Sequence, residues 1–387
     1  MDNLTHSLVG LTAAKAGLER LSPGASILCV LAANAPDSDV AVVLFGDRWD
    51  YLQHHRGITH SIAGVVALAV LLPLIFYGVD RLRARLRRQP PKTNLRGLLI
   101  ASSIVSATHP LLDWTNNYGI RLLLPWSPRW FYGDLVFIID PFLWVVLGAA
   151  AFLLTSKTPL SKVIWSAFAG VTSFLVVMGP RASDLPNRGL IIALWLGAVV
   201  AAIALYRNGA REKWGERIAF AAFAVVFVYW GMLAVAHSRA VEQGREAAAG
   251  IVAPNGETVL RLAAMPTLAN PLRWECVFET DRATYRFPVR LNAGNSPTRV
   301  IRYEKPAGAL AQVMNTVGQQ KPGRVFLGFA RFPVASLADP DCTTQTLVQL
   351  ADLRYTEPGR SRGAFAVELP VDCPNEAGPR ETVTEGR

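Results

Sequence analysis

The chain begins with a series of apolar segments, several of which are long enough to cross a membrane. Residues 61–79 contain no charged side chain, and the segments 162–179, 189–206 and 218–236 have the same apolar character. An apolar run of about 18 residues or more is typical of a transmembrane helix. The pattern therefore predicts a membrane protein that crosses the bilayer several times.

Two further spans are expected at 97–113 and 135–155, and two shorter helices, 3–19 and 24–36, precede all of these as a hairpin. The first ten residues lack a basic region and a small-residue cleavage site, so we expect no cleaved signal peptide. The predicted fold class is mainly α, a polytopic transmembrane helical bundle of about 6 to 8 membrane helices over residues 1–237.

The pattern changes after residue 237, where short apolar runs are separated by Pro, Gly and Asn. Alternation of apolar and polar positions predicts strands at Arg273–Thr280, Thr284–Leu291 and Gly323–Phe332. Residues 238–387 are therefore expected to form a soluble β-rich domain. We expect this domain to bind or position a substrate, because it contains no histidine and no nucleophile motif.

Two kinds of residue in this domain predict structure rather than chemistry. Trp274 and Phe278 are expected in its core, since large aromatic side chains there are more often buried than used as ligand platforms. Three of the four cysteines, Cys276, Cys342 and Cys373, also lie in it. In an oxidising compartment one disulfide could form, with Cys342 and Cys373 as the preferred pair.

Composition and charge agree with a membrane protein. The hydrophobic fraction is 51% and the mean hydropathy is +0.27, which exclude an ordinary soluble enzyme. Much of the net charge of +10 comes from the segment 80–96, which has seven basic side chains and one acidic side chain between two apolar spans. Such a loop is typical of the cytoplasmic side, so nucleic-acid binding is not expected.

This assignment of the loop 80–96 determines the predicted topology. The loops placed inside then carry thirteen basic residues and those outside carry six, as the positive-inside rule requires. The domain after residue 237 is expected outside the membrane.

Histidines and aspartates are interleaved in the first third of the chain. Five of the six histidines lie within the first 109 residues. The residues concerned are His6, His54, His55, His60 and His109, with Asp37, Asp39 and Asp113. In the predicted topology most of them reach one depth at the outer side, and His109 and Asp113 share a helix face. Histidine and carboxylate are ligands of zinc, manganese and iron, and ionisable groups in a membrane are candidates for function.

Four of these segments resemble one known family, the YdjM-type, LexA-binding, inner-membrane-associated hydrolases. They are Thr5–Gly10, Ala35–Asp39, His54–Ser61 and His109–Asp113 with Tyr118 and Gly119. Asp134 and the stretch Asp140–Trp144 also fit the family pattern, and the resemblance covers roughly residues 1 to 145. It implies location in a bacterial inner (plasma) membrane and metal dependence, through distant similarity to zinc-dependent phospholipase C and related nucleases. LexA binding is not expected of a site that faces outward.

The resemblance also implies a set of metal ligands. These are His6, Asp37 or Asp39, His60, His109 and Asp113, with Asp113 able to bridge two ions. His237 is the only histidine after Asp113, so a three-ion site is not expected. The expected cofactor is one or two divalent metal ions, with zinc as the first choice and manganese or iron as alternatives.

A metal centre at the outer membrane face favours hydrolysis of a phosphoester that is lipid-like or small and close to the membrane. His54 and His55 are candidates for the general acid or base, or are ordinary loop residues. Arg56 and Arg121 either contact the phosphate or anchor lipid headgroups. Asp140 either supports the site or caps a helix before Pro141.

Two other function classes compete with a membrane hydrolase. A transporter would place polar residues along several spans, but the spans after Asp140 are almost wholly apolar. A scaffold that binds metal without turnover would need only the ligands. The sequence does not predict the oligomeric state.

Overall fold

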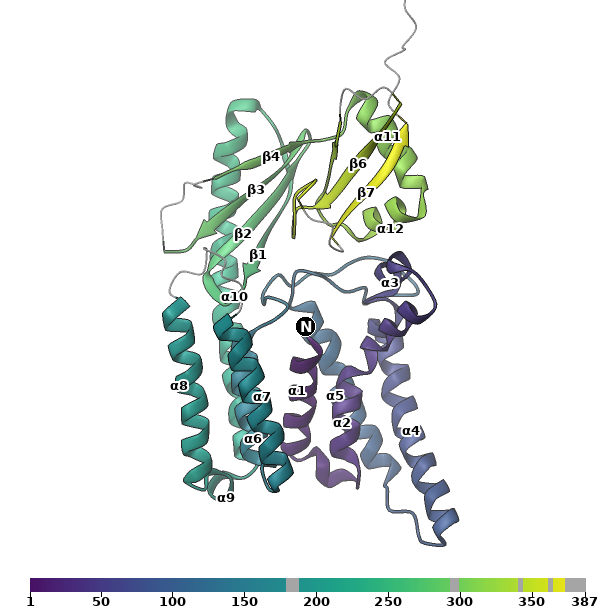
Figure 1. Ribbon diagram of the computed structural model, residues 1–387, viewed down its shortest axis with the longest axis vertical. Coiled ribbons are helices and arrows are strands. Elements are labelled where there is room, and N and C mark those ends of the chain that lie inside the picture. Colours follow the sequence, from purple (N-terminus) through teal and green to yellow (C-terminus); the bar gives the residue numbers. More distant parts are fainter. Residues whose placement is uncertain (179–187, 293–298, 340–343, 361–364, 373–387) are drawn as a thin grey trace, which may run out of the picture. The chain divides into compact units, whose positions relative to one another are not determined.

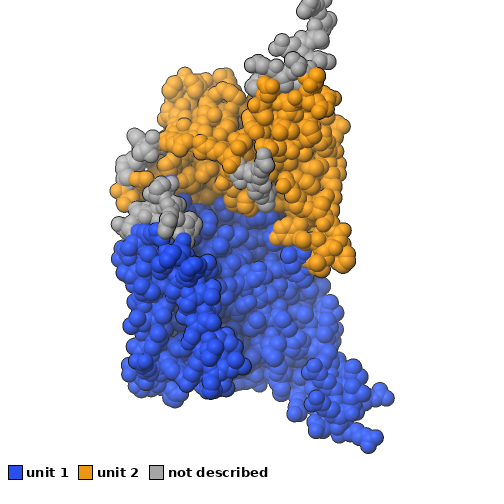
Figure 2. All heavy atoms as spheres, in the orientation of Figure 1, with its two compact units in different colours: residues 1–40, 55–239, 266–273 blue, residues 41–54, 240–265, 274–387 orange. Residues whose placement is uncertain are grey.

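The computed structural model describes residues 1–178, 188–292, 299–339, 344–360 and 365–372. These residues form two compact units, which are coloured separately in Figure 2. Unit 1 comprises residues 1–40, 55–239 and 266–273, and unit 2 comprises residues 41–54, 240–265 and 274–387.

Unit 1 is a bundle of helices (Figure 1). Its α-helices are α1 (Asn3–Lys15), α2 (Ala25–Asn34), α4 (Ile62–Arg87), α5 (Leu95–Trp114), α6 (Pro141–Thr155), α7 (Pro159–Met178), α8 (Arg188–Arg207), α9 (Ala210–Trp214) and the first part of α10 (Arg217–Val252). Three short 3-10 helices join them, η1 (Leu18–Leu21), η2 (Ala35–Leu44) and η3 (Ile58–His60).

Six helical segments in the described part of the chain are long and apolar enough to cross a membrane, which confirms the predicted fold class. They are Ala25–Leu44, Ile62–Arg87, Leu95–Trp114, Pro159–Met178, Arg188–Arg207 and Arg217–Asn255. Helix α6 is apolar but shorter. Helix α1 has 13 residues, about 20 Å at 1.5 Å per residue, which is less than the thickness of the hydrocarbon core.

Helix α1 is surrounded by other helices of unit 1. Ala14 is fully buried in an apolar cluster with residues of α2 and α5, and Leu8 is buried in a second cluster with residues of α6. At Gly10 a Cβ atom would lie 2.6 Å from the carbonyl oxygen of Cys29, so only glycine permits the close approach of α1 to α2. This packing brings His6, one turn before Gly10, into the interior of the bundle.

Two of the predicted spans have different ends in the structure. The span expected at 135–155 begins as a helix only at Pro141, because the side chain of Asp140 caps α6 by accepting a hydrogen bond from the Phe142 N–H at 2.8 Å. The span expected at 218–236 is part of α10, which continues to Val252. At Gly244 the added Cβ would lie 2.9 Å from Cys276 Sγ, so this second part of α10 packs closely on a strand of unit 2.

Unit 2 contains two antiparallel sheets, whose strands follow one another in sequence order. The first sheet has β1 (Val259–Thr267), β2 (Asn270–Thr280), β3 (Ala283–Arg290) and β4 (Ile301–Glu304), and the second has β5 (Pro333–Leu337), β6 (Gln345–Asp352) and β7 (Ala366–Asp372). Helices α3 (Arg48–His54), α11 (Gly308–Gln319) and α12 (Lys321–Phe329) accompany them. Trp274 and Phe278 are buried, which confirms their prediction as core residues.

The strand predicted at Gly323–Phe332 is wrong, because most of this segment forms α12. Val325, Phe326 and Phe329 are its buried apolar residues, and their spacing fits one face of a helix as well as it fits a short strand. Pro322 lies in the first turn of α12, where it is compatible with a helix.

Glu257 is a buried carboxylate at the start of the first sheet. It accepts hydrogen bonds from Thr280 Oγ1 at 2.6 Å, from Tyr285 Oη at 2.9 Å and from Arg302 at 3.0 Å. Burial alone would raise the pKa of Glu257, but these hydrogen bonds lower it below its ordinary value. The carboxylate therefore links β2, β3 and β4 in its charged form.

The predicted disulfide between Cys342 and Cys373 stays a prediction, because both cysteines lie outside the described residues. Cys29 and Cys276 are buried free thiols.

Candidate metal centre

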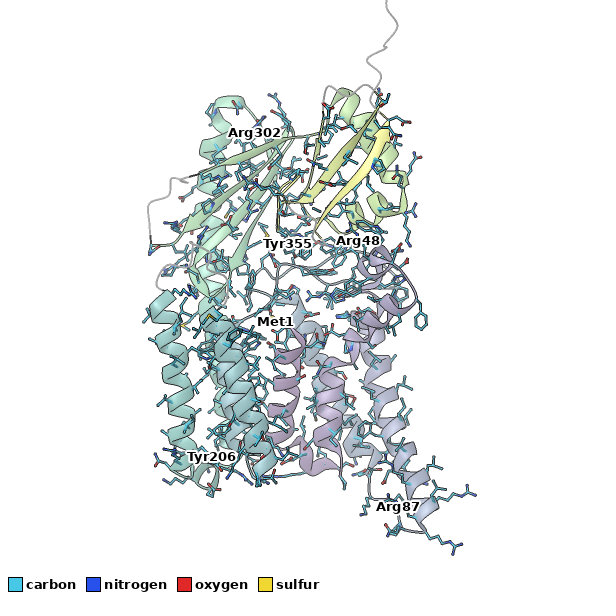
Figure 3. The ribbon with its side chains drawn as sticks, viewed as in Figure 1. Met1, Arg48, Arg87, Tyr206, Arg302 and Tyr355 are labelled. Carbon is cyan, nitrogen blue, oxygen red and sulfur yellow. The ribbon has the colours of Figure 1, made fainter. Side chains whose placement is uncertain are left out.

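The six predicted metal ligands, all in unit 1, gather at one end of its helices. His6 comes from α1, Asp37 and Asp39 from η2, His60 from η3, and His109 and Asp113 from α5. The amino group of Met1 contacts Asp113. Figure 3 shows Met1 at the opposite end of the helices from Arg87 and Tyr206.

Four side-chain atoms form what we call the inner group: Asp37 Oδ1, His60 Nε2, His109 Nε2 and Asp113 Oδ2. His60 Nε2 lies 3.2 Å from Asp37 Oδ1 and 3.3 Å from Asp113 Oδ2. His109 Nε2 lies 3.7 Å and 3.6 Å from the same two oxygens. Ligands at 2.0–2.2 Å from one ion in a tetrahedron would be about 3.3 to 3.6 Å apart, so these four distances are compatible with a bound metal ion.

The imidazole rings of the inner group are held in fixed orientations. His109 Nδ1 lies 2.7 Å from the carbonyl oxygen of Ala33, which can only accept, so this nitrogen carries the proton and Nε2 presents its lone pair to the group. His60 Nδ1 lies 3.3 Å from Asp39 Oδ2, an arrangement that orients metal-binding histidines in many proteins. Among the described residues, His109 Nε2 is buried without a hydrogen-bond partner, which a bound cation would supply.

The charge of the inner group also suits a cation. Burial disfavours the charged form of His60, but its hydrogen bonds with Asp113 and Asp37 raise the pKa of this ring above the ordinary value for histidine. In the absence of metal, the two carboxylates therefore attract a proton to His60. A divalent ion would take the place of that proton.

A second set of side chains, which we call the outer group, consists of Asp37, Asp39 and His55. His55 Nδ1 lies 3.2 Å from Asp39 Oδ1, and His55 is partly exposed. Asp37 is the member common to both groups, whereas the family resemblance implied that Asp113 is able to bridge two ions. Asp39 belongs to the outer group and also orients His60.

His6 borders the inner group from α1. Its Nε2 lies 3.3 Å from Asp113 Oδ1, and its ring stacks on that of His109 with 3.9 Å between the centroids. Its Nδ1 is buried without a hydrogen-bond partner in the described part of the structure. The structure thus brings all six predicted ligands together. His6, however, belongs to neither the inner nor the outer group.

The structure places Arg56, a candidate for contact with the phosphate, against Asp113. Its side chain is buried, and its guanidinium pairs with both oxygens of Asp113 at 3.1 Å. Its Nη1 also donates to Asn116 Oδ1 at 2.9 Å and to the carbonyl oxygen of Gly119 at 3.2 Å. Arg56 therefore holds Asp113 in position. Asn116 was not recognised from the sequence, although it follows Asp113 within one helical turn.

The other candidate residues lie outside the two groups. His54 is exposed, and its Nδ1 lies 2.8 Å from the carbonyl oxygen of Asp50 in its own helix. Asp140 caps α6 and accepts a hydrogen bond from Tyr229 Oη at 2.8 Å. Arg121 donates to the carbonyl oxygen of His55 at 3.3 Å, which places it at the edge of the outer group.

These features define the protein as a multi-pass membrane protein with a buried aspartate and histidine cluster that could hold a metal ion. Residues 1–182 match the YdjM inner membrane protein family, and this part of the chain contains every residue of both groups. The family resemblance seen in the sequence is thereby confirmed.

Two relatives are similar to part of the chain. An uncharacterized protein, YfhP of Bacillus subtilis (strain 168), is 27% identical over 155 residues, which are 38% of this chain and 43% of YfhP. Inner membrane protein YbcI of Escherichia coli (strain K12) is 29% identical over 178 residues, which are 43% of this chain and 91% of YbcI. The chain thus spans less than half the length of YfhP. No solved structure matches.

Proposed function

We propose that the protein is an integral-membrane, metal-dependent hydrolase that cleaves a phosphoester in a lipid-like or membrane-proximal substrate at the outer face of the inner membrane. The observation that carries the proposal is the inner group, in which two carboxylate oxygens and two imidazole nitrogens converge at distances of 3.2 to 3.7 Å. Such a donor set, buried beside membrane helices, favours a metal site over a structural cluster.

The inner group would hold the first ion, and Asp37, Asp39 and His55 would hold a second. Zinc is our first choice, with manganese or iron as alternatives. Divalent metal in these positions would supply Lewis-acid stabilisation of a phosphoryl oxygen and an activated water.

The protein's own residues would prepare the site for this reaction. Arg56 keeps Asp113 ionised and oriented through two contacts of 3.1 Å, so that its Oδ2 faces the inner group. His55 is the candidate to move a proton, because it is partly exposed and its Nδ1 lies 3.2 Å from Asp39, which sets the tautomer of the ring.

The location of the site follows from charge. The basic loop that contains Arg87 lies at the opposite end of the unit 1 helices from Met1, whose amino group contacts Asp113 (Figure 3). Since basic loops favour the cytoplasm, the cluster would face outward. A substrate reaching it there would be a lipid headgroup or a small phosphoester near the membrane.

The proposal is tested with detergent-purified protein, comparing wild type, His109→Ala and His54→Ala. His54 is an exposed control of the same residue type. Metal content is measured by mass spectrometry, and hydrolysis is measured on a panel of phospholipids and soluble phosphoesters.

We expect wild type and His54→Ala to contain metal and to hydrolyse at least one substrate, and His109→Ala to lose both properties. Chelation should stop hydrolysis, and zinc or manganese should restore it. If metal-loaded, folded wild type turns over no substrate of the panel, the protein is instead a non-catalytic metal-binding scaffold or a transporter.

A further inference from the structure

Unit 1 contains a cavity of about 300 Å³ between helices α6, α7 and α8, separate from the metal centre. Its walls include Trp144 and Gly148 of α6, Phe168 and Thr172 of α7, and Trp195 of α8. Aromatic and aliphatic side chains make up most of the remaining lining. Its size is at the lower end of the range for small-ligand sites.

Three polar side chains of the cavity wall are bonded within the protein. Trp195 Nε1 donates to Ser173 Oγ at 2.9 Å, and Thr172 Oγ1 donates to the carbonyl oxygen of Phe168 at 2.8 Å. Trp165 Nε1 donates to Thr155 Oγ1 at 2.8 Å. These side chains therefore offer carbon surface to an occupant, and an apolar ligand fits better than a polar one.

The environment of the cavity indicates where an apolar ligand would come from. Helices α7 and α8 are both long and apolar enough to cross a membrane. Ile203 of α8, which lines the cavity, is 43% exposed, and Ser166 of α7 is also an exposed lining residue. The cavity is thus open at the surface of two membrane helices. In a bilayer this surface faces the hydrocarbon chains of lipids.

One wall of the cavity is connected to the helix that carries His6. Trp144 Nε1 donates to Asp2 Oδ1 at 3.1 Å, and the same oxygen caps α1 by accepting from the Thr5 N–H at 2.9 Å. Asp2 is also tied to the segment before α6, because its N–H donates to the carbonyl oxygen of Ile138 at 3.2 Å. The end of the cavity at Trp144 therefore adjoins the end of the bundle at which the metal centre lies.

We propose that this cavity binds one hydrocarbon chain of a membrane lipid, and that the chain belongs to the substrate, with the polar end of that lipid directed toward the metal centre. The second half of this statement rests on the proposed function. The first half concerns binding alone and can be tested without turnover.

The first experiment measures binding by photolabelling. Wild type, Gly148→Leu and Gly197→Leu are placed in vesicles that contain a phospholipid with a diazirine on its acyl chain, and labelled peptides are mapped. A Cβ atom at Gly148 would lie 3.0 Å from Phe168, so leucine there occupies the cavity. A Cβ atom at Gly197 would meet nothing within 4 Å, so leucine there is a matched control on a membrane helix.

We expect labelling of peptides that contain Trp144 and Trp195 to fall at least about tenfold in Gly148→Leu, because losing the burial of two methylenes already changes an affinity by about that factor. Gly197→Leu should be labelled like wild type. If Gly148→Leu does not fold, Ile203→Trp at the open side of the cavity should give the same loss. Equal labelling in wild type and a folded cavity variant would overturn the proposal.

The second experiment measures hydrolysis of a long-chain and a water-soluble phosphoester. Gly148→Leu should raise KM for the long-chain substrate and leave the soluble substrate and the metal content unchanged. If no substrate turns over, the proposed function fails while photolabelling still decides whether the cavity binds lipid. If labelling is lost but both substrates react as in wild type, the bound chain is not part of the substrate.

Discussion

Replacement of Arg56 by methionine distinguishes the two roles considered for this arginine. The structure places its guanidinium on Asp113, Asn116 and Gly119 inside the protein. The sequence left open a direct contact with a substrate phosphate. A residue that holds Asp113 affects the stability and metal content of the protein, whereas a phosphate ligand affects only catalysis.

The expected loss of stability can be worked out from the contacts. Removing one partner of a buried ion pair costs about 3 to 5 kcal/mol, because the other charge is left without compensation. Asp113 would keep His60 at 3.3 Å and the amino group of Met1 as neighbours, so we take the lower end, about 3 kcal/mol. For a unit of this size, that corresponds to a melting temperature lower by about 6 to 12 °C.

The assay is thermal unfolding of purified protein in detergent, followed by metal analysis of the same samples. Arg129→Met is the matched control, since Arg129 is exposed and its guanidinium stacks on Phe131. We expect the control to stay within about 0.5 kcal/mol of wild type. If Arg56→Met melts like the control, keeps its metal and loses only affinity for a phosphoester, our assignment of Arg56 to Asp113 is wrong.

Three further predictions concern other parts of the chain. His60→Ala and Asp113→Ala should each reduce bound metal and hydrolysis by at least about tenfold in folded protein, because a small ligand set tolerates few losses, and full metal retention would contradict this. Alkaline phosphatase fused at residue 88 should be inactive and a fusion after residue 240 active, and the opposite result would reverse the topology. The first sheet of unit 2 should lose protection from hydrogen exchange in acid. The lowered pKa of Glu257 contributes stability that is complete above its ordinary value of 4.5 and is lost as the pH falls through the folded value. Unchanged acid sensitivity in Glu257→Gln would contradict this assignment.

Much of the membrane region could be predicted from the sequence because its signals are long. Apolar runs of helical length indicated α4, α5, α7 and α8, and the four-residue spacing of His109 and Asp113 placed both side chains on one helix face. Short segments contain weaker signals, since the apolar residues of α12 fit either a strand or a helix. Its conformation depends on contacts within unit 2 that a local pattern does not contain.

The details of the candidate centre could not be predicted for a similar reason. Arg56 adopts a positive φ of 52°, which is uncommon for a residue other than glycine, and this conformation accompanies the burial of its guanidinium. The different positions of Asp37 and Asp39 arise in the 3-10 helix η2, where residues two apart point in different directions. A sequence shows two nearby aspartates but not which of them is common to two groups.

The position of Asp37 in both groups leads to a prediction about the number of ions. If both groups bind metal, wild type should contain about two ions per chain, His55→Ala about one, and Asp37→Asn less than one, because only Asp37 contributes to both. Asp39→Asn should lose the outer ion and also weaken the inner one by about 10- to 100-fold, since Asp39 Oδ2 lies 3.3 Å from His60 Nδ1 and orients that ring. Metal analysis at increasing concentrations of zinc measures both effects. One ion per chain in both wild type and His55→Ala would show that the inner group binds alone, and that His55 and Asp39 only support it.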